Sequence, residues 1–101
     1  DFLWDCADKA YHASRTDGES LSLEKLREMH PAIRQRVIVK AFEAAGLTQD
    51  ITAAHLFAAE RLLDSEEGTK TLDFPKGYAM EIQYGQVRCL RKNSSRIDFL
   101  P

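Results

Sequence analysis

The sequence has few of the residues that cross-link or interrupt a chain. Its 101 residues include two cysteines, three prolines and five glycines. Cys6 and Cys89 are far apart in sequence, which excludes a disulfide framework and a paired-cysteine zinc motif. We interpret both as small buried hydrophobic residues, as expected for a protein of the reducing cytoplasm. No apolar run is long enough to cross a bilayer, so no membrane partner is expected.

Motifs that carry catalysis are also absent from the sequence. It has no glycine-rich phosphate loop, no Gly-x-Ser-x-Gly, no Cys-x-x-Cys and no His-Glu-x-x-His. His12, His30 and His55 stand far apart, and none has a ligand-spaced neighbour in the same predicted element. We therefore predict no catalytic residue, no metal site and no cofactor bound by this chain.

The composition is that of one globular domain. Hydrophobic residues make up 44% of the chain and charged residues 30%, which are ordinary values for a protein with a packed core. A chain of this length buries roughly two-thirds of its unfolded surface and can fold without metal or disulfides. We predict a single domain over residues 1–101. The chain begins at Asp1 and not at methionine, which indicates a segment of a longer protein.

Hydrophobic periodicity predicts four helices before residue 65. Ser22 and Pro31 are typical of helix starts, and Gly46 is typical of a helix end. Either Asp50 or Thr52 can cap the last helix, and the sequence does not choose between them. That helix is apolar around more than half of its circumference, so we expect it at the centre of the domain. The predicted helices cover residues 1–14, 23–29, 31–45 and 52–64.

After residue 70 the apolar residues alternate with polar ones, which predicts strands. Met80, Ile82 and Tyr84 share one strand face, which we expect to cover the helices. The predicted strands cover residues 70–74, 78–84 and 87–91. The fold class is therefore α+β: a four-helix-like, mainly α domain capped by a small C-terminal three-stranded antiparallel sheet.

Two turns separate the predicted strands. Pro75 and Gly77 supply the chemistry of the first turn, because proline presets φ and glycine tolerates a positive φ. Gly85 followed by Gln86 forms a two-residue link, and glycine in the first position suits a type II′ hairpin. We expect Pro75, Gly77 and Gly85, together with Gly46 at the helix end, to have structural roles.

The charges are unevenly distributed, although the net charge is only −2. From Lys70 to the end there are six basic and three acidic residues, whereas the chain before Lys70 is net negative. Basic side chains beside Tyr78 and Tyr84 suit an RNA surface, because cations neutralise phosphates and rings stack on unpaired bases. The same tyrosines would pack equally well against the helices. The candidate contacts in this region are Lys76, Arg88, Arg91 and Lys92.

Two further candidates lie on the predicted helix 31–45. Arg36 and Lys40 are one turn apart and share a face with Glu43, whereas Arg34 projects from the other side of the helix. Arg36 and Lys40 fit a surface that contacts phosphates. They fit a solvated face with ordinary ion pairs as well.

Helices followed by a hairpin also fit the outline of a winged-helix DNA-binding domain. The helix in the recognition position opposes that interpretation, because it presents Ala53 and Ala54 near its start and has Arg61 as its one basic residue. A helix that reads the major groove needs Arg, Lys, Asn or Gln there. A protein-interaction module without a nucleic-acid role is the third interpretation.

Two stretches together resemble the small domain that follows the catalytic domain in tRNA(Ile)-lysidine synthetases. They are LSLEKLREMHPAIRQRVIVKAFEAAGL and DITAAHLFAAERLLDSEEGTKTLDFPKGYAMEIQYGQVRCLRK. The similarity lies in a proline-led helix ending in glycine, a helix ending in two leucines, a Leu-Pro-x-Gly turn and a Tyr-Gly turn. Phe74 replaces the leucine of that turn, a conservative departure. The resemblance covers residues 20–92.

The resemblance implies an indirect role in a ligase reaction. Enzymes of this family use ATP to join lysine to the wobble cytidine of the isoleucine tRNA with a CAU anticodon. Their Ser-Gly-Gly-x-Asp-Ser ATP-binding loop is missing from this chain. ATP and Mg²⁺ are therefore expected for the full-length enzyme, and this chain alone is expected to be inactive.

The resemblance also implies partners and residue roles. The expected partners are the tRNA and the enzyme's own N-terminal catalytic domain, in the cytoplasm. Arg36 falls on an arginine that the family tends to carry and would contact tRNA or the neighbouring domain. His55 falls on the family's histidine, and we expect it to be structural.

Overall fold

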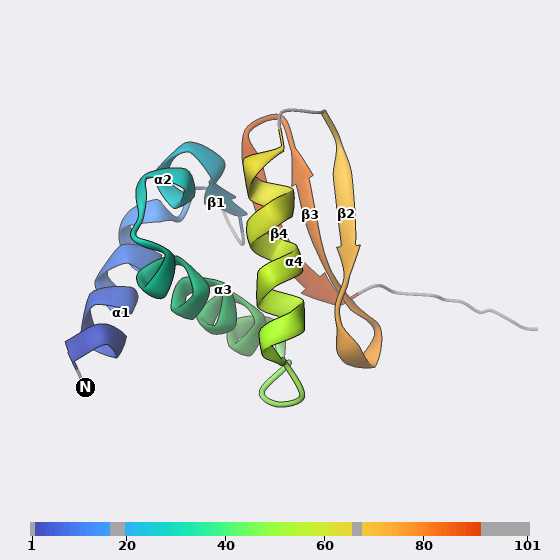
Figure 1. Cartoon of the computed structure of the whole chain (residues 1–101), viewed down its shortest axis with the longest axis horizontal. Coiled ribbons are helices and arrows are strands. Elements are labelled where there is room, and N and C mark those ends of the chain that lie inside the picture. The colour runs from blue at the N-terminus through green and yellow to red at the C-terminus, as the bar shows by residue number, and fades with distance from the viewer. Residues whose placement is uncertain (1, 17–19, 66–67, 92–101) are drawn as a thin grey trace, which may run out of the picture.

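The computed structural model describes residues 2–16, 20–65 and 68–91. Within these ranges the chain folds as four α-helices and one antiparallel sheet, so the predicted α+β class with four helices is confirmed (Figure 1). The helices are α1 (Phe2–Ser14), α2 (Leu23–Glu28), α3 (Pro31–Ala45) and α4 (Ala53–Asp64). The strands are β1 (Ser20–Ser22), β2 (Lys70–Asp73), β3 (Tyr78–Gln83) and β4 (Gln86–Arg91), with a 3₁₀ turn, η1 (Pro75–Gly77), between β2 and β3.

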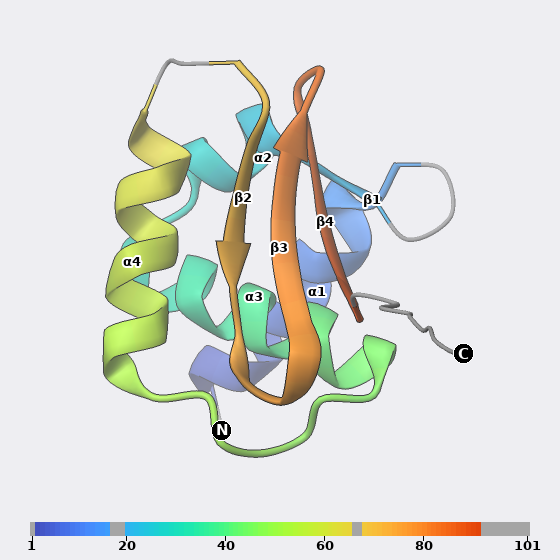
Figure 2. The ribbon, with the colours of Figure 1, turned by 90° about the vertical axis from the view of Figure 1, so that its right-hand side faces the viewer.

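The sheet has four strands, so the predicted three-stranded C-terminal cap is wrong. Its order is β1-β4-β3-β2, and β1 pairs antiparallel with the first half of β4. A three-residue strand is too short to show a period of two, so its sequence did not reveal it. Helices cover one face of the sheet, and the other face is turned to the viewer in Figure 2. Because β1 lies between α1 and α2, the sheet joins a strand from the first quarter of the chain to the three strands that begin at Lys70.

Local caps fix where the helices begin and end. The Ser22 hydroxyl accepts a hydrogen bond from the Lys25 N–H and caps α2, as predicted. Pro31 is the first residue of α3, and Gly46 ends that helix in the left-handed region with φ 116°. The Gly46 N–H donates to the last carbonyls of α3, which glycine allows without a steric cost.

Thr52 caps α4, which decides between the two candidates. Its hydroxyl accepts from the His55 N–H, while His55 Nδ1 accepts from the Thr52 N–H at 2.9 Å. This reciprocal pair is a capping box in which histidine takes the place of the usual glutamate or glutamine. Asp50 instead has a positive φ of 75° in the preceding turn.

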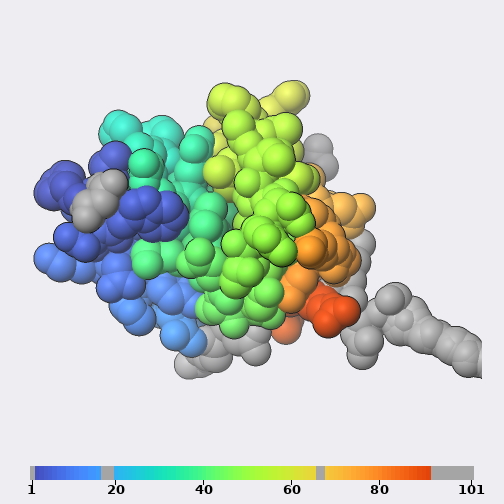
Figure 3. Space-filling model, turned by 90° about the horizontal axis from the view of Figure 1, so that it is seen from below, coloured from blue at the N-terminus to red at the C-terminus, as the bar shows by residue number. Residues whose placement is uncertain are grey.

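The core forms around α3, and the prediction that α4 is central is wrong. Val37, Ile38 and Phe42 of α3 are fully buried, between α1 on one side and β4 on the other. In α4 the buried residues are Ala59 and Leu63 alone. Helix α4 is largely apolar in sequence, but most of its residues are not buried. Many of the apolar residues are alanines, which favour a helix whether or not they pack against the core. Figure 3 shows α1, α3 and α4 side by side across the lower surface.

The turn between β3 and β4 differs from the predicted type II′ turn. Gln83 pairs with Gln86, so Tyr84 and Gly85 are its central residues, and both have positive φ (53° and 74°). Two positive φ values define a type I′ turn. Tyr84 is 91% exposed, so its predicted place on the core-facing side is also wrong. Tyr78 is the buried tyrosine, beside Phe42.

The two cysteines have different environments. Cys89 is buried among apolar residues, as predicted, and that burial raises the pKa of its thiol. Cys6 is only half-buried, so its assignment to the core is wrong. Both are free thiols.

Candidate nucleic-acid interface

The basic residues proposed as RNA contacts lie at three separate places in the fold. Arg36 and Lys40 lie on α3 against α1, and Arg88 lies in the middle of β4. Arg91 at the end of β4 and Lys76 in η1 line one hollow. Lys92 lies outside the described residues. The structure therefore brings together Arg91 and Lys76 and leaves the other candidates apart from them.

Arg36 and Lys40 both contact Trp4 of α1. The Arg36 guanidinium carbon is 5.5 Å from the indole ring centroid, and Lys40 Nζ is 5.6 Å from it. Both distances suit a cation–π interaction. Lys40 also pairs with Asp8 at 3.4 Å, and Arg36 donates to the carbonyl of Ala32. The contacts with Trp4 and Asp8 hold α1 on α3, so any RNA contact by Arg36 or Lys40 would compete with packing inside the domain.

Arg34 has a role that the sequence did not reveal. Its side chain is almost fully buried, and it donates to the carbonyls of Leu26 and Met29 at 2.9 and 2.8 Å. It also pairs with Glu60 of α4 at 2.9 Å. One guanidinium thus joins α2, α3 and α4, because its fork of donors reaches several acceptors at once. Arg27 adds a second such link by donating to the carbonyl of Leu63 in α4 and to that of Ser65, which caps the end of the helix.

Arg88 lies on the sheet face that the helices leave open. It is exposed and pairs in register with Glu81 of β3 on one side and Ser20 of β1 on the other. A carboxylate directly across the strands reduces the attraction of this position for phosphate. The open face is therefore a mixed polar surface and not a basic one.

Arg91 and Lys76 lie near the end of α3, where the strand, the helix and η1 meet. They line a hollow of about 210 Å³ together with Gly46, Tyr78 and residues 47–49. Lys76 pairs with Asp50 at 3.3 Å, with both side chains about half exposed. An exposed pair of this kind is weak, so Lys76 can exchange its partner for a phosphate at little cost.

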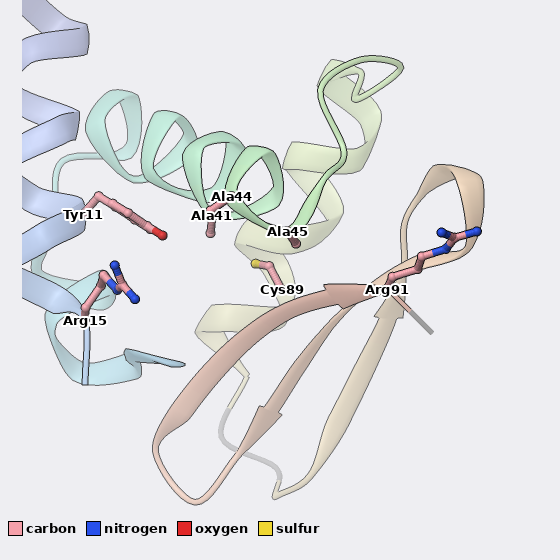
Figure 4. Close-up of a pocket in the computed structure, with 7 residues that line it drawn as sticks. All are labelled: Tyr11, Arg15, Ala41, Ala44, Ala45, Cys89 and Arg91. Atoms are coloured by element: carbon pink, nitrogen blue, oxygen red, sulfur yellow. The ribbon is translucent and has the colours of Figure 1, made fainter. Parts of the chain in front are cut away.

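A larger pocket of about 460 Å³ adjoins Arg91 on the other side (Figure 4). Its two charged lining residues are Arg91 and Arg15, the latter at the end of α1. Arg15 follows the predicted helix 1–14 and is not among the predicted contacts. A predicted sheet of three strands left no reason to expect the end of α1 beside β4, so only the fold brings these arginines to one pocket. The remaining lining residues are Tyr11, Ala41, Ala44, Ala45 and Cys89.

The residues expected to be structural occupy helix ends and turns. A Cβ on Gly46 would lie 2.6 Å from the Tyr78 hydroxyl oxygen, so the space as well as the φ angle favours glycine there. Pro75 begins η1, and Gly77 and Gly85 have positive φ. The His55 ring stacks on Phe74 at 5.5 Å between centroids. His55 therefore contacts the residue that follows β2 as well as capping α4.

Within the described residues, no group of His, Cys, Asp or Glu side chains could hold a metal ion. No helix in the same part of the chain is long and apolar enough to cross a membrane. The surface features of interest are accordingly the basic residues, the two hollows beside Arg91 and a group of exposed aromatic side chains.

Comparison with family models gives a match over residues 21–92 to the TilS substrate binding domain. This chain belongs to that family. The TilS substrate-binding domain is the accessory domain of tRNA(Ile)-lysidine synthetases, so the resemblance seen in the sequence is confirmed. A search of curated proteins finds no match.

Family membership gives the domain an accessory role, with tRNA as its partner, in a TilS protein that modifies tRNA. The match begins at β1 and includes α2, α3, α4 and the rest of the sheet. Helix α1 precedes the matched residues, although it packs on α3, and Tyr11 of α1 and the adjacent Arg15 line the larger pocket. Two of the seven residues that line that pocket therefore come from outside the family match.

Proposed function

We propose that this TilS domain helps to hold isoleucine tRNA with a CAU anticodon while lysine is joined to its wobble cytidine. The observation that carries the proposal is the family match over residues 21–92. ATP and Mg²⁺ are proposed as cofactors of the whole enzyme, bound by its N-terminal catalytic domain. The cytoplasm is its proposed location, and this chain alone is proposed to be inactive.

The placement of exposed cations supports a tRNA contact at one side of the domain. Arg15, Arg91 and Lys76 line two hollows that share Arg91, along the ends of α1, α3 and β4. Cations in such an arrangement can follow an RNA backbone, because each neutralises one phosphate and releases counterions. Arg36, Lys40 and Arg88 remain candidates, but they lie elsewhere: Arg36 and Lys40 contact α1, and Arg88 lies opposite Glu81 on the open face of the sheet.

A second proposed role is to support the catalytic domain through the helices. Trp4 of α1 and Leu56 of α4 line a hollow of about 230 Å³ together with residues of α3. On the same two helices, Phe2 is 76% and Phe57 66% exposed. Large aromatic side chains at a surface are typical of protein interfaces. This observation favours docking within the parent protein over a free DNA-binding module.

Binding of tRNA by the domain can be measured by fluorescence anisotropy with labelled isoleucine tRNA. We expect weak binding that decreases with salt, and no sequence preference for duplex DNA of similar length. The Lys76→Gln/Arg91→Gln double variant should bind several-fold more weakly, whereas Arg61→Gln, an exposed change on α4, should not. Tight, sequence-dependent binding to duplex DNA would favour the winged-helix alternative, and loss of binding in Arg61→Gln alone would place the interface on α4.

A further inference from the structure

The pocket between α1, α3 and β4 has a size that suits one nucleotide. Its volume is about 460 Å³, within the range of roughly 300–1,000 Å³ found for small-molecule sites. Three alanines of the last turns of α3, Ala41, Ala44 and Ala45, form its floor (Figure 4). Their small side chains leave the space open between the helix and the strand.

The charges around the pocket favour an anionic ligand. Among its described lining residues Arg15 and Arg91 are charged, and no carboxylate is present. Cys89 also lines the pocket, and burial raises the pKa of its thiol, so this residue adds no negative charge at neutral pH. The interior is thus uncharged, and the positive charge lies at two ends of the pocket.

The floor and the wall set the orientation of such a ligand. The last turn of a helix carries partial negative charge on its carbonyl groups, which disfavours a phosphate over the alanines and suits the N–H groups of a base. The wall is made by α1, where the Arg15 guanidinium lies 5.6 Å from the ring centroid of Tyr11. Unpaired bases stack on aromatic rings and on arginine planes of this kind.

We propose that this pocket binds one unpaired nucleotide of the RNA, with its base over the alanine floor and its phosphates on Arg15 and Arg91. The inference rests on the proposed tRNA-binding function and extends it to a defined site. Arg91 also lines the hollow that contains Lys76, so the RNA backbone continues from the pocket along that side. Figure 4 shows the Arg91 side chain directed away from Arg15.

Filling the pocket without changing its charge tests the proposal. Ala44 is exposed on α3, so Ala44→Leu should fold normally, because leucine is nearly as good a helix former as alanine. Ala54→Leu, at an exposed position of α4 outside the pocket, is the matched control. Circular dichroism melting curves establish that both variants fold. The probes are isoleucine tRNA, an RNA duplex with one bulged nucleotide, the same duplex fully paired, and cytidine monophosphate.

The wild-type chain should bind the bulged duplex more tightly than the paired one. In Ala44→Leu we expect affinity for the bulged duplex and the tRNA to fall about tenfold, as loss of one stacked base predicts, with no change in Ala54→Leu. Arg15→Gln should weaken binding of the same two RNAs, because it removes a cation that lines the pocket.

Three outcomes would overturn the proposal. If Ala44→Leu binds tRNA as the wild type does, the pocket is not the site, but the tRNA-binding function stands. If the wild type binds no RNA, the nucleotide site and the proposed tRNA-binding function are both wrong. If cytidine monophosphate alone binds as tightly as the bulged duplex, the pocket is a site for free nucleotides and not for RNA.

Discussion

Arg34 and Arg36 carry the same side chain but have different roles in this domain. Arg34 and Arg36 are two positions apart on α3, yet the first is buried among carbonyls and the second lies against an indole ring. Buried arginines need several acceptors, since an unpaired buried charge is very costly. The carbonyls of the α2–α3 connection and Glu60 meet that need for Arg34.

Replacing Arg34 with methionine should destabilise the domain by about 3 kcal/mol, because Glu60 and two buried carbonyls lose their partner. Urea unfolding followed by circular dichroism measures the change. Arg61→Met is the matched control, as Arg61 is exposed on α4, and its effect should stay within about 0.5 kcal/mol. Equal unfolding midpoints for the two variants would show that Arg34 does not link the helices.

Cys89 should make stability depend on pH in the alkaline range. Burial raises the pKa of its thiol above the ordinary value of 9.0, so only the unfolded chain forms the thiolate easily. The stability from a raised pKa is complete below the unfolded pKa and is lost as pH rises above it. Between about pH 9 and pH 10 the wild type should lose about 1 kcal/mol more than Cys89→Ala does. Parallel pH profiles for the two proteins would contradict this.

At the scale of elements, the ends of helices and strands decide the architecture more than their interiors do. Thr52 and His55 close the start of α4, and Gly46 turns the chain out of α3. The type I′ turn at Tyr84 and Gly85 sets the register of β3 on β4, which places Val87 and Cys89 toward the helices. A one-residue shift would turn those side chains to the open face.

Gly46→Ala should be strongly destabilising, whereas Gly68→Ala should be nearly neutral. At Gly46 the φ of 116° disfavours any side chain, and a Cβ would lie 2.6 Å from the Tyr78 hydroxyl. We expect a loss of about 2 kcal/mol or more. At Gly68 no atom lies within 4 Å of an added Cβ, and its φ is not positive. Thermal unfolding of both variants measures the difference, and similar melting temperatures would refute the role of Gly46.

At the scale of the whole molecule, charge placement matters more than net charge. The net charge of −2 gives no general attraction for nucleic acid. Arg15, Arg91 and Lys76 nevertheless come together from three segments of the chain around two adjoining hollows. A local positive region can bind RNA on an overall negative protein, because screening limits electrostatic interactions to about 10 Å at ordinary salt.

The salt dependence of tRNA binding should report these three cations. With one phosphate on each, the slope of log K against log salt concentration should be about −2 to −3. Lys76→Gln should make the slope less negative by about 1, and Arg61→Gln should leave it unchanged. Anisotropy titrations from low to moderate salt provide the values. A slope near zero for the wild type would exclude phosphate contacts.

Much of the local structure was determined by the sequence alone. Hydrophobic periodicity, Pro31 and Gly46 defined α3, and Ser22 was predicted as the cap of α2. These features depend on interactions between residues a few positions apart, so a short stretch of sequence is enough to predict them. The resemblance to the synthetase domain depended likewise on the order of helix ends and turns, and the family match confirms it.

Only the tertiary structure decided which segments meet. The pairing of β1 with β4 and the burial of Arg34 against Glu60 each depend on residues distant in sequence. The same holds for the pocket that joins Arg15, next to α1, to Arg91 of β4. Packing selects such contacts by buried area and satisfied polar groups across the whole molecule, and no local pattern of charges or apolar residues carries that information.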